Sequence, residues 1–442
     1  MNYFDVIAHP ENYDFTIPTI GAGALPSPIS GRGFIGDDGR VSFAKREAEI
    51  RSLMAKGGTY PAFEEAGPRA KIFHDPAWAR VAILTAGGLC PGLNDVIKGL
   101  VETLWFSYGV RSIFGIRYGY RGLNPAYGLT PMMLTADEVD TIHEDGGSIL
   151  GSSRGSQPVD VMVDTLQRMN ITTLFCIGGD GTLRGANQIA EEIARRCLSI
   201  NVVGVPKTID NDLSFVGQTF GFETAVTTCH GIITSAHMEA KGACNGIGLV
   251  KLMGRDSGFI AAHASLSNSV VNYCLVPEVD FDLEGPNGLL AKLERRLKAG
   301  KGHAVIVVAE GAGQKFFQGL PEERDASGNI KKHDIGELLR GAIPKYLAEH
   351  GVECSIRYFD PSYLIRSVPT RGNDAIFCYQ LAENAVHAAM AGKTDMVIGK
   401  WGTQFVHVPI PLAITSRQKI NPEGALWQAV LASTRQDREF NV

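Results

Sequence analysis

The sequence predicts an α/β protein with two similar lobes, each built on a doubly wound parallel sheet, and an N-terminal extension. The chain has 442 residues. Because one hydrophobic core seldom grows beyond roughly 250–300 residues, we expect two domains. From residue 80 onward, short apolar runs alternate with stretches of helical periodicity. This alternation is typical of βαβ units and therefore of parallel sheets.

Residues 1–79 differ in composition and pattern from the rest of the chain and form the predicted extension. The stretch IPTIGAGALPSPISGRG (17–33) is rich in Pro, Gly and Ser, which is typical of an extended arm. Within the same region, SFAKREAEIRSLMAKG (42–57) predicts one short helix. We therefore expect an arm that precedes the two lobes.

Four apolar runs predict the strands of the first lobe: residues 81–88, 112–119, 172–179 and 200–206. Between the first two runs, apolar residues from Val96 to Leu104 recur at helical spacing, and Asn94 is a suitable N-cap. Residues 182–196 predict a second helix after the third strand. Strand, helix and strand at this spacing indicate a doubly wound parallel sheet.

A second series of apolar runs predicts the second lobe: residues 245–254, 269–278, 303–311 and 352–360. Helical stretches again separate these runs. The two series therefore indicate two lobes of similar construction, although no exact internal repeat is present.

Composition excludes several classes of protein. The net charge of −5, with Lys and Arg spread along the chain, argues against a nucleic-acid or membrane partner. No apolar run reaches the length of a membrane span, and the N-terminus lacks the pattern of a signal peptide. The eight cysteines form no C-x-x-C pair, so we expect buried free thiols and a cytoplasmic location.

The loops after the predicted strands carry residues suited to phosphate. TAGGLCPGLN (85–94) ends the first strand with Gly87 before a helix, so its backbone N–H groups could receive phosphate, although a tight strand–helix turn explains it equally well. IGGDGTLRGA (177–186) contains more glycine than a turn needs. There Asp180 is a hard oxygen ligand for Mg²⁺, and Thr182 is expected to cap the next helix, although Asp180 could be an ordinary turn residue.

Several further charges follow predicted strands. Arg154 lies in GGSILGSSRG (146–155), Arg255 in KLMGRDSGF (251–259), and Glu310 in EGAGQ (310–314). Each could be an ordinary surface charge, and the same holds for Arg357 and Arg366. Together, however, glycine, acid and arginine at five strand ends are what a phosphoryl-transfer cleft requires, since its catalysis depends on positioning and charge neutralisation.

The segment PKTIDND (206–212) places Asp210 and Asp212 two residues apart. On an extended segment both carboxylates would lie on the same face. We assign Asp210 as the base that accepts a proton from an attacking hydroxyl and Asp212 as its helper. A solvated Asx turn is the alternative, but it leaves Lys207 unexplained.

In this order, GGDGT, PKTIDND, KLMGR and YLIR resemble the phosphofructokinase superfamily, from about residue 80 to residue 411. The resemblance implies Asp210 as the base for the 1-hydroxyl of fructose 6-phosphate, with Asp212, Thr208 and Lys207 completing the catalytic group. It implies a phosphoryl-donor site for ATP and Mg²⁺ formed by Gly87, Arg154, Gly155, Gly179, Asp180, Gly181 and Thr182, with Asp180 at the metal. It implies a sugar-phosphate site formed by Thr208, Ile209, Asp210, Met253, Gly254, Arg255, Glu310, Tyr363, Leu364, Ile365 and Arg366.

The same resemblance implies the organisation of the chain. Residues 80–221 with 365–415 would form a phosphoryl-donor lobe, and residues 222–364 with 416–442 a sugar-phosphate lobe. Arg357 matches an arginine that the family supplies from a neighbouring subunit, which implies a homodimer or homotetramer.

The choice of donor depends on two positions. Bacterial ATP enzymes of the family carry glycine at the positions of Gly181 and Lys207, whereas pyrophosphate enzymes typically carry Asp and Lys. The combination of Gly and Lys resembles the ATP-using plant and trypanosomatid members of the pyrophosphate-type branch. We therefore expect an ATP-dependent 6-phosphofructokinase. The alternatives are a reversible pyrophosphate-dependent enzyme, a non-catalytic regulatory subunit, or an NAD or lipid kinase that shares only GGDGT.

Overall fold

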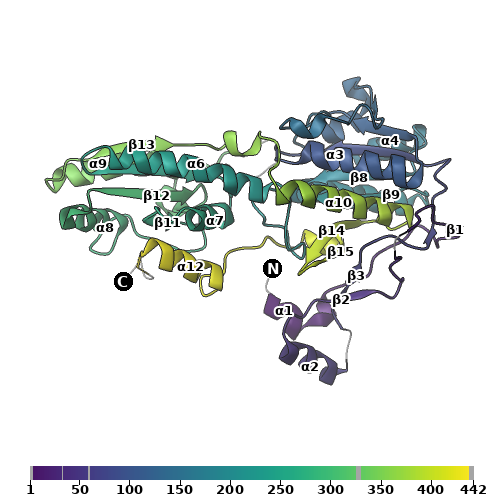
Figure 1. Cartoon of the computed structure of the whole chain (residues 1–442), viewed down its shortest axis with the longest axis horizontal. Helices are drawn as coiled ribbons and strands as arrows, with labels where there is room; N and C mark the ends of the chain where they lie inside the picture. The colour runs from purple at the N-terminus through teal and green to yellow at the C-terminus, as the bar shows by residue number, and fades with distance from the viewer. Residues whose placement is uncertain (1–2, 32, 58–59, 325–329, 438–442) are drawn as a thin grey trace. The chain divides into compact units, whose positions relative to one another are not determined.

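The computed structural model describes residues 3–31, 33–57, 60–324 and 330–437, and its contacts divide the chain into two compact units (Figure 1). Unit 1 comprises Met1–Thr208, Leu213–Gly221 and Ser367–Arg417. Unit 2 comprises Ile209–Asp212, Phe222–Arg366 and Gln418–Val442. The chain therefore passes between the units several times, and the PKTIDND segment is divided between them.

Unit 1 is built on a mixed sheet in which nine strands lie in the described residues. Their order is β2 (Arg40–Ser42), β3 (Ala62–Glu65), β15 (Gln404–Pro409), β14 (Met396–Trp401), β9 (Asn201–Pro206), β8 (Thr173–Gly178), β5 (Arg80–Thr85), β6 (Ser112–Ile116) and β7 (Met132–Met133). The strands from β14 to β6 are parallel, and those outside them are antiparallel. The predicted parallel α/β fold is confirmed, with antiparallel edges that the apolar runs did not indicate.

Helices pack against this sheet in pairs, α3 with α10 and α4 with α5. The α-helices of unit 1 are α1 (Tyr3–Ala8), α2 (Glu47–Lys56), α3 (Leu93–Glu102), α4 (Val159–Arg168), α5 (Asp180–Arg195), α10 (Asn373–Met390) and α11 (Ile410–Ala413). Its shorter turns are η1 (Pro10–Asn12), the π-helical η2 (Thr103–Tyr108), η3 (Gly119–Leu123), η4 (Pro125–Tyr127) and η5 (Ile142–Glu144).

The predicted N-cap of α3 is wrong. Gly92 holds the cap position with a φ of 94°, and no side chain caps the helix. The buried Asn94 amide instead donates to the Asp145 carbonyl and accepts from the Ile149 N–H. Asn94 therefore ties the helix to a neighbouring loop, because that loop offers unpaired backbone groups that the sequence pattern does not reveal.

The N-terminal extension belongs to unit 1. Its strands β2 and β3 continue the large sheet, and β1 (Leu25–Pro26) pairs with β4 (Lys71–Ile72) in a small sheet of its own. The fully buried Phe43 ring stacks on Trp401 with 4.9 Å between centroids. Aromatic burial of this size is a large apolar contribution, so the extension adds to the core of unit 1.

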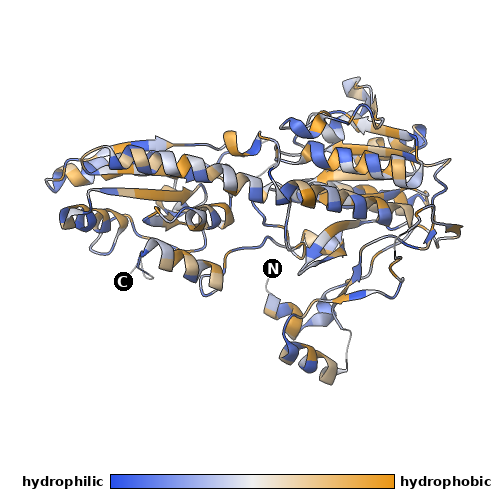
Figure 2. Ribbon diagram, viewed as in Figure 1, coloured by the Kyte–Doolittle hydropathy of each residue, from blue (hydrophilic) through white to orange (hydrophobic). Residues whose placement is uncertain are grey.

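Unit 2 contains a smaller sheet with four parallel strands in the described residues, and Figure 2 colours its strand β12 largely as hydrophobic. The order is β11 (Tyr273–Leu275), β12 (His303–Ala309), β10 (Gly246–Leu252) and β13 (Ser355–Phe359). Its helices are α6 (Phe222–Lys241), α7 (Phe259–Ser267), α8 (Leu289–Arg296), α9 (Ile335–Glu349) and α12 (Ala425–Thr434), with short turns η6 (Leu297–Lys301), η7 (Gln314–Phe317) and η8 (Leu364–Arg366).

The cysteines are free thiols, and most of them are buried as expected. Burial raises the pKa of the Cys176 thiol to about 12, so this group stays neutral and unreactive at pH 7. Cys197 and Cys244 are exposed, against the expectation. None of the helices in the described part of the chain combines the length and apolar character needed to cross a membrane.

Candidate active-site residues

In unit 1, the predicted donor residues follow the ends of neighbouring parallel strands. β5 lies between β6 and β8, so the strand order reverses at β5, and ligands of open α/β sheets bind at such a point, beyond the carboxyl ends of the strands. Gly87 follows β5, Gly179 follows β8, and Lys207 follows β9. The fold therefore brings these three residues to one edge of the sheet.

Lys207 lies over the glycine loop after β5. Its side chain is buried, and Nζ donates to the Gly88 carbonyl at 2.8 Å. A Cβ on Gly87 would lie 3.0 Å from the same Nζ, and Gly87 has a φ of 91°. Both the backbone conformation and the nearby ammonium therefore favour glycine at this position. The Lys207 ammonium is a fixed positive charge beside the backbone of this loop.

The turn between β8 and α5 is closely packed except at one residue. A Cβ on Gly178 would lie 2.2 Å from the Thr182 side chain, and one on Gly179 would lie 3.1 Å from the Lys207 carbonyl. A Cβ on Gly181 would meet nothing within 4 Å. Gly181 is thus the member of this turn that faces open space.

We expected Thr182 to cap α5, but it does not. Gly179 occupies the cap position without a side-chain hydrogen bond, and Thr182 lies inside the first turn, buried against Gly178. The first N–H groups of α5 are therefore not occupied by a capping side chain. The positive end of this 16-residue helix is suited to an anion such as a phosphate.

Asp180 lies at the start of α5 and forms ion pairs with Arg184 at 3.2 Å and Arg417 at 3.7 Å. In the described residues, no group of three or more His, Cys, Asp and Glu side chains could hold a metal alone. Mg²⁺ that arrives with phosphates needs only one or two protein carboxylates. The Arg184 side chain is 54% exposed, so its pair with Asp180 is weak and exchangeable, and Asp180 fits the role of a single carboxylate ligand.

Arg154 and Gly155 lie on the loop that runs beside the Gly87 turn. Ser152 Oγ donates to the Gly87 carbonyl at 2.6 Å, and the Gly87 N–H donates to the Ser153 carbonyl at 3.0 Å. Gly155 has a φ of 99°, which glycine adopts readily. Two hydrogen bonds therefore fix this loop against the turn, and the exposed Arg154 follows the anchored serines.

The segment after Thr208 is a turn rather than the extended segment that we expected. Asn211, between the two aspartates, has a φ of 53°. Asn tolerates this left-handed conformation because its short amide bonds locally. The argument that both carboxylates share one face is therefore wrong. Asp210 is half-buried, whereas Asp212 is buried and its carbonyl accepts from the Gln418 N–H at 2.7 Å.

In unit 2, Arg255 and Glu310 come together beyond the ends of β10 and β12. The Glu310 carboxylate accepts from the Arg255 N–H at 2.9 Å. Arg255 has a φ of 46°, a conformation uncommon for a non-glycine residue and often found at functional sites. A Cβ on Gly311 would lie 1.8 Å from the Arg255 carbonyl, so Gly311 is required for this arrangement.

Met253 and Gly254 lead into the same turn. Gly254 has a φ of 140°, and its carbonyl accepts from the Ser257 N–H at 2.8 Å. Ser257 Oγ also lies 3.5 Å from the Asp210 carbonyl. The turn after β10 therefore contacts the backbone of the predicted base within unit 2.

The YLIR residues form a 3₁₀ turn with one cationic side chain. The Arg366 guanidinium lies over the Tyr363 ring, 4.7 Å from its centroid. Within the described residues, Arg366 Nε is buried and has no hydrogen-bond partner. Tyr363 and Leu364 are exposed, whereas Ile365 is fully buried and Ile209 is buried, so the side chains of these two isoleucines belong to the core.

Arg357 lies on the edge strand β13. Its guanidinium donates to Ser355 Oγ at 2.8 Å, and it pairs with Glu239 at 3.6 Å. The Arg357 side chain is 48% exposed. It is therefore accessible at the surface of unit 2.

The phosphofructokinase family model matches residues 80–389 of this chain. The chain belongs to the phosphofructokinase family. A protein from Borreliella burgdorferi called ATP-dependent 6-phosphofructokinase is 50% identical over 438 residues, which cover 96% of this chain and 97% of that protein. A protein of the same description from Amycolatopsis methanolica is 50% identical over 92% of this chain and 90% of its own length.

Solved structures of the family share the fold at low identity. The pyrophosphate-dependent phosphofructokinase of Marinobacter aquaeolei aligns with a TM-score of 0.63 and 18% identity, over 80% of this chain and 91% of that chain. The T-state phosphofructokinase of Pichia pastoris aligns with a TM-score of 0.63 and 19% identity, over 90% of this chain and 40% of that chain. These neighbours confirm the predicted fold class.

Sequence reasoning missed residues that hold the predicted ones in place. Gly311 makes room for the Arg255 carbonyl, and Ser152 anchors the Arg154 loop to Gly87. Gly311 directly follows Glu310 at a strand end, so its position was a signal that we did not use. Arg417 gave no such signal, since only the fold brings it to Asp180.

Proposed function

We propose that this chain transfers the γ-phosphoryl group of ATP to the 1-hydroxyl of fructose 6-phosphate, which gives fructose 1,6-bisphosphate and ADP. The observation that carries this proposal is 50% identity, over nearly the whole of both chains, to a relative called ATP-dependent 6-phosphofructokinase. Two groups of residues support this proposal. The glycine loops beside Lys207 suit the phosphates of the donor, and the Arg255–Glu310 pair suits the sugar phosphate.

The donor lobe, residues 80–221 with 365–415, would hold ATP. The open space at Gly181 supports a nucleotide over pyrophosphate, because a nucleotide brings an α-phosphate and a nucleoside that need room. Gly87, Gly179 and the start of α5 would supply backbone N–H donors to the phosphates, and Thr182 would line the same turn. Arg154 and Gly155 belong to the same donor site, where the arginine would neutralise charge on the donor.

The sugar-phosphate lobe, residues 222–364 with 416–442, would bind fructose 6-phosphate. Arg255 and Arg366 would neutralise its 6-phosphate, and the unpartnered Arg366 Nε supports this role. Glu310 would accept from a sugar hydroxyl while it holds the Arg255 backbone. Met253, Gly254, Tyr363 and Leu364 would shape the sugar pocket, together with backbone groups of Thr208, Ile209 and Ile365.

In the reaction, Asp210 would accept the proton of the sugar 1-hydroxyl. The oxygen of that hydroxyl forms a bond to the γ-phosphorus of ATP. The bond between that phosphorus and the β–γ bridging oxygen breaks, and ADP leaves. Thr208 and Lys207 would stabilise the transferred group, and Asp212 would keep the Asp210 turn in place. Mg²⁺, held through Asp180 and donor phosphates, would neutralise phosphate charge.

A coupled assay of the purified protein with each donor tests this function. We expect kcat/KM with ATP to exceed that with pyrophosphate by at least 100-fold, in the presence of Mg²⁺. A preference for pyrophosphate would overturn the choice of donor. No turnover with either donor would favour a regulatory subunit.

The assembly and location are also proposals. Exposed Arg357 on an edge strand is suited to reach a neighbouring subunit in a homodimer or homotetramer. Light scattering during size-exclusion chromatography measures this state, and a monomer that is fully active would refute it. The buried free thiols support a reducing compartment such as the cytoplasm.

A further inference from the structure

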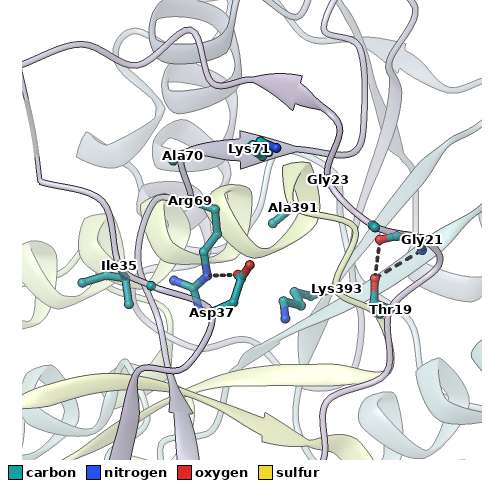
Figure 3. Close-up of a pocket in the computed structure, with 12 residues that line it drawn as sticks. Thr19, Gly21, Gly23, Ile35, Asp37, Arg69, Ala70, Lys71, Ala391 and Lys393 are labelled. Carbon is teal, nitrogen blue, oxygen red and sulfur yellow. Dashed lines mark hydrogen bonds and ion pairs between the residues drawn. The ribbon is translucent and has the colours of Figure 1, made fainter.

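Unit 1 contains a cavity of about 430 Å³ between the extension and the turn that follows α10 (Figure 3). This volume lies within the range of small-molecule sites. Charged and polar side chains reach it from segments far apart in the sequence. They include Thr19, Asp37, Arg69, Lys71 and Lys393.

The cavity lies away from the donor residues of the same unit. Lys393 precedes β14, which pairs in parallel with β9. The cavity is therefore at the amino end of these strands, whereas Lys207 follows the carboxyl end of β9. A ligand here would not be an ATP molecule bound at the glycine loops.

Backbone hydrogen bonds hold the walls of the cavity in place. The Ile20 N–H donates to the Gly392 carbonyl at 2.9 Å, and the Thr394 N–H donates to the Pro18 carbonyl at 3.0 Å. On the other side, the Ile35 N–H donates to the Pro68 carbonyl at 2.9 Å. The cavity is thus formed before a ligand arrives, which lowers the entropic cost of binding.

Arg69 is a buried cation with one donor left over. It is 4% exposed, and its terminal nitrogens donate to the Glu64 carboxylate and to the Gly67 and Glu65 carbonyls. Arg69 Nε has no hydrogen-bond partner in the described residues, although Asp37 lies 3.4 Å from it. Figure 3 shows this ion pair beside Lys393. The Asp37 side chain is 89% exposed, so it is weakly held and free to swing into solvent.

The charges around the cavity favour a dianion. Glu64 is ionised: burial alone would raise its pKa, but the hydrogen bond with His407 and the hydrogen bond and charge of Lys393 lower it. Burial lowers the pKa of His407, so that ring is neutral at pH 7. Once Asp37 swings away, the positive charges of Arg69, Lys71 and Lys393 exceed the single negative charge of Glu64 by two.

We propose that this cavity binds a small phosphate monoester, whose dianion replaces the Asp37 carboxylate at Arg69 Nε and meets Lys71 and Lys393. Because the walls come from both the extension and the α10–β14 turn, the ligand joins these segments. Binding of a phosphorylated metabolite at this site would therefore stabilise the packing of the extension on the rest of unit 1.

Calorimetric titration of the full chain with inorganic phosphate and with glycerol 3-phosphate tests this inference. Lys71→Met removes a cation at an exposed strand position and should weaken the binding of glycerol 3-phosphate at least 10-fold. Asp37→Asn removes the competing carboxylate and should strengthen it about 3- to 10-fold. Arg69 itself is left intact because its burial makes its loss a folding defect.

Lys298→Met is the matched control, because it removes a lysine paired with Glu294 on α8 of unit 2. It should leave the affinity for both probes unchanged, and all three variants should retain turnover of the substrates. Binding that is the same in Lys71→Met and Asp37→Asn as in the wild type would overturn the proposal. Binding of inorganic phosphate without glycerol 3-phosphate would overturn the assignment of a monoester.

Discussion

Gly181→Asp isolates the position that would distinguish ATP from pyrophosphate. Gly181 is the second residue of α5, and a Cβ there would meet nothing within 4 Å. The substitution therefore creates no clash, and an acid in the first turn of a helix is favourable. Loss of activity in this variant would report on the donor rather than on the fold.

The magnitude follows from the charge that the variant adds. A carboxylate about 5 Å from a phosphate charge, at an effective dielectric constant of about 20, is repelled by about 3 kcal/mol. That energy corresponds to roughly a 10²-fold loss of kcat/KM for ATP. Pyrophosphate has no nucleoside and no α-phosphate, so its turnover should be unchanged or should increase, with Lys207 already in place.

The assay compares kcat/KM for both donors in the wild type, Gly181→Asp and the control Gly181→Ala. The alanine variant adds a methyl group without charge and should stay within about 3-fold of the wild type with ATP. If Gly181→Asp kept ATP turnover within that range, the nucleotide would not lie at this position. If Gly181→Ala lost as much activity as Gly181→Asp, bulk rather than charge would be responsible.

Three further variants test separate elements. Asp210→Asn should lower kcat roughly 10²- to 10⁴-fold with little change in the KM of fructose 6-phosphate, and near-normal kcat in steady-state assays would refute its role as base. Arg366→Ala should raise that KM at least 10-fold, because a phosphate loses a charged partner worth about 1.5–3 kcal/mol, and an effect on the KM of ATP alone would contradict this assignment. The pKa of Glu64 is lowered from its ordinary 4.5 to about 2, so its ionised form stabilises the fold above pH 4.5, and this stability is lost as the pH falls towards 2. Glu64→Gln should therefore lower the melting temperature at pH 7 by roughly 5–10 °C, and a gap to the wild type that does not narrow below pH 4.5 would refute the reasoning.

The strands of both units could be located from sequence to within about three residues at their carboxyl ends, because two signals coincide there. A buried parallel strand is a continuous apolar run, and the residues after it change abruptly to glycine or charge. The end of β8 was predicted within one residue, at Gly178. In unit 2, β12 ends at Ala309, two residues before the end of the predicted run, and Glu310 follows it.

Local backbone choices could not be predicted in the same way. Asn94 and Thr182 are good capping residues by propensity. Asn94, however, bonds to a loop that only the fold supplies, and Thr182 lies inside the first turn of α5, packed against Gly178. The left-handed Asn211 breaks the alternation that the two aspartates suggested. The extension was read as an arm because its strands are short, and short strands give little periodicity.

The glycines of the turn after β8 are present for different structural reasons. Gly178 is explained by packing, because any Cβ there would collide with Thr182, and Gly179 is restricted by the Lys207 carbonyl. Gly181 has no such neighbour, and its helical position makes glycine about 1 kcal/mol less favourable than alanine. A glycine that costs stability and fills no packing need is compatible with the proposed donor site. The bound donor is the group that would occupy this space, and the variants at Gly181 measure how much of that space it needs.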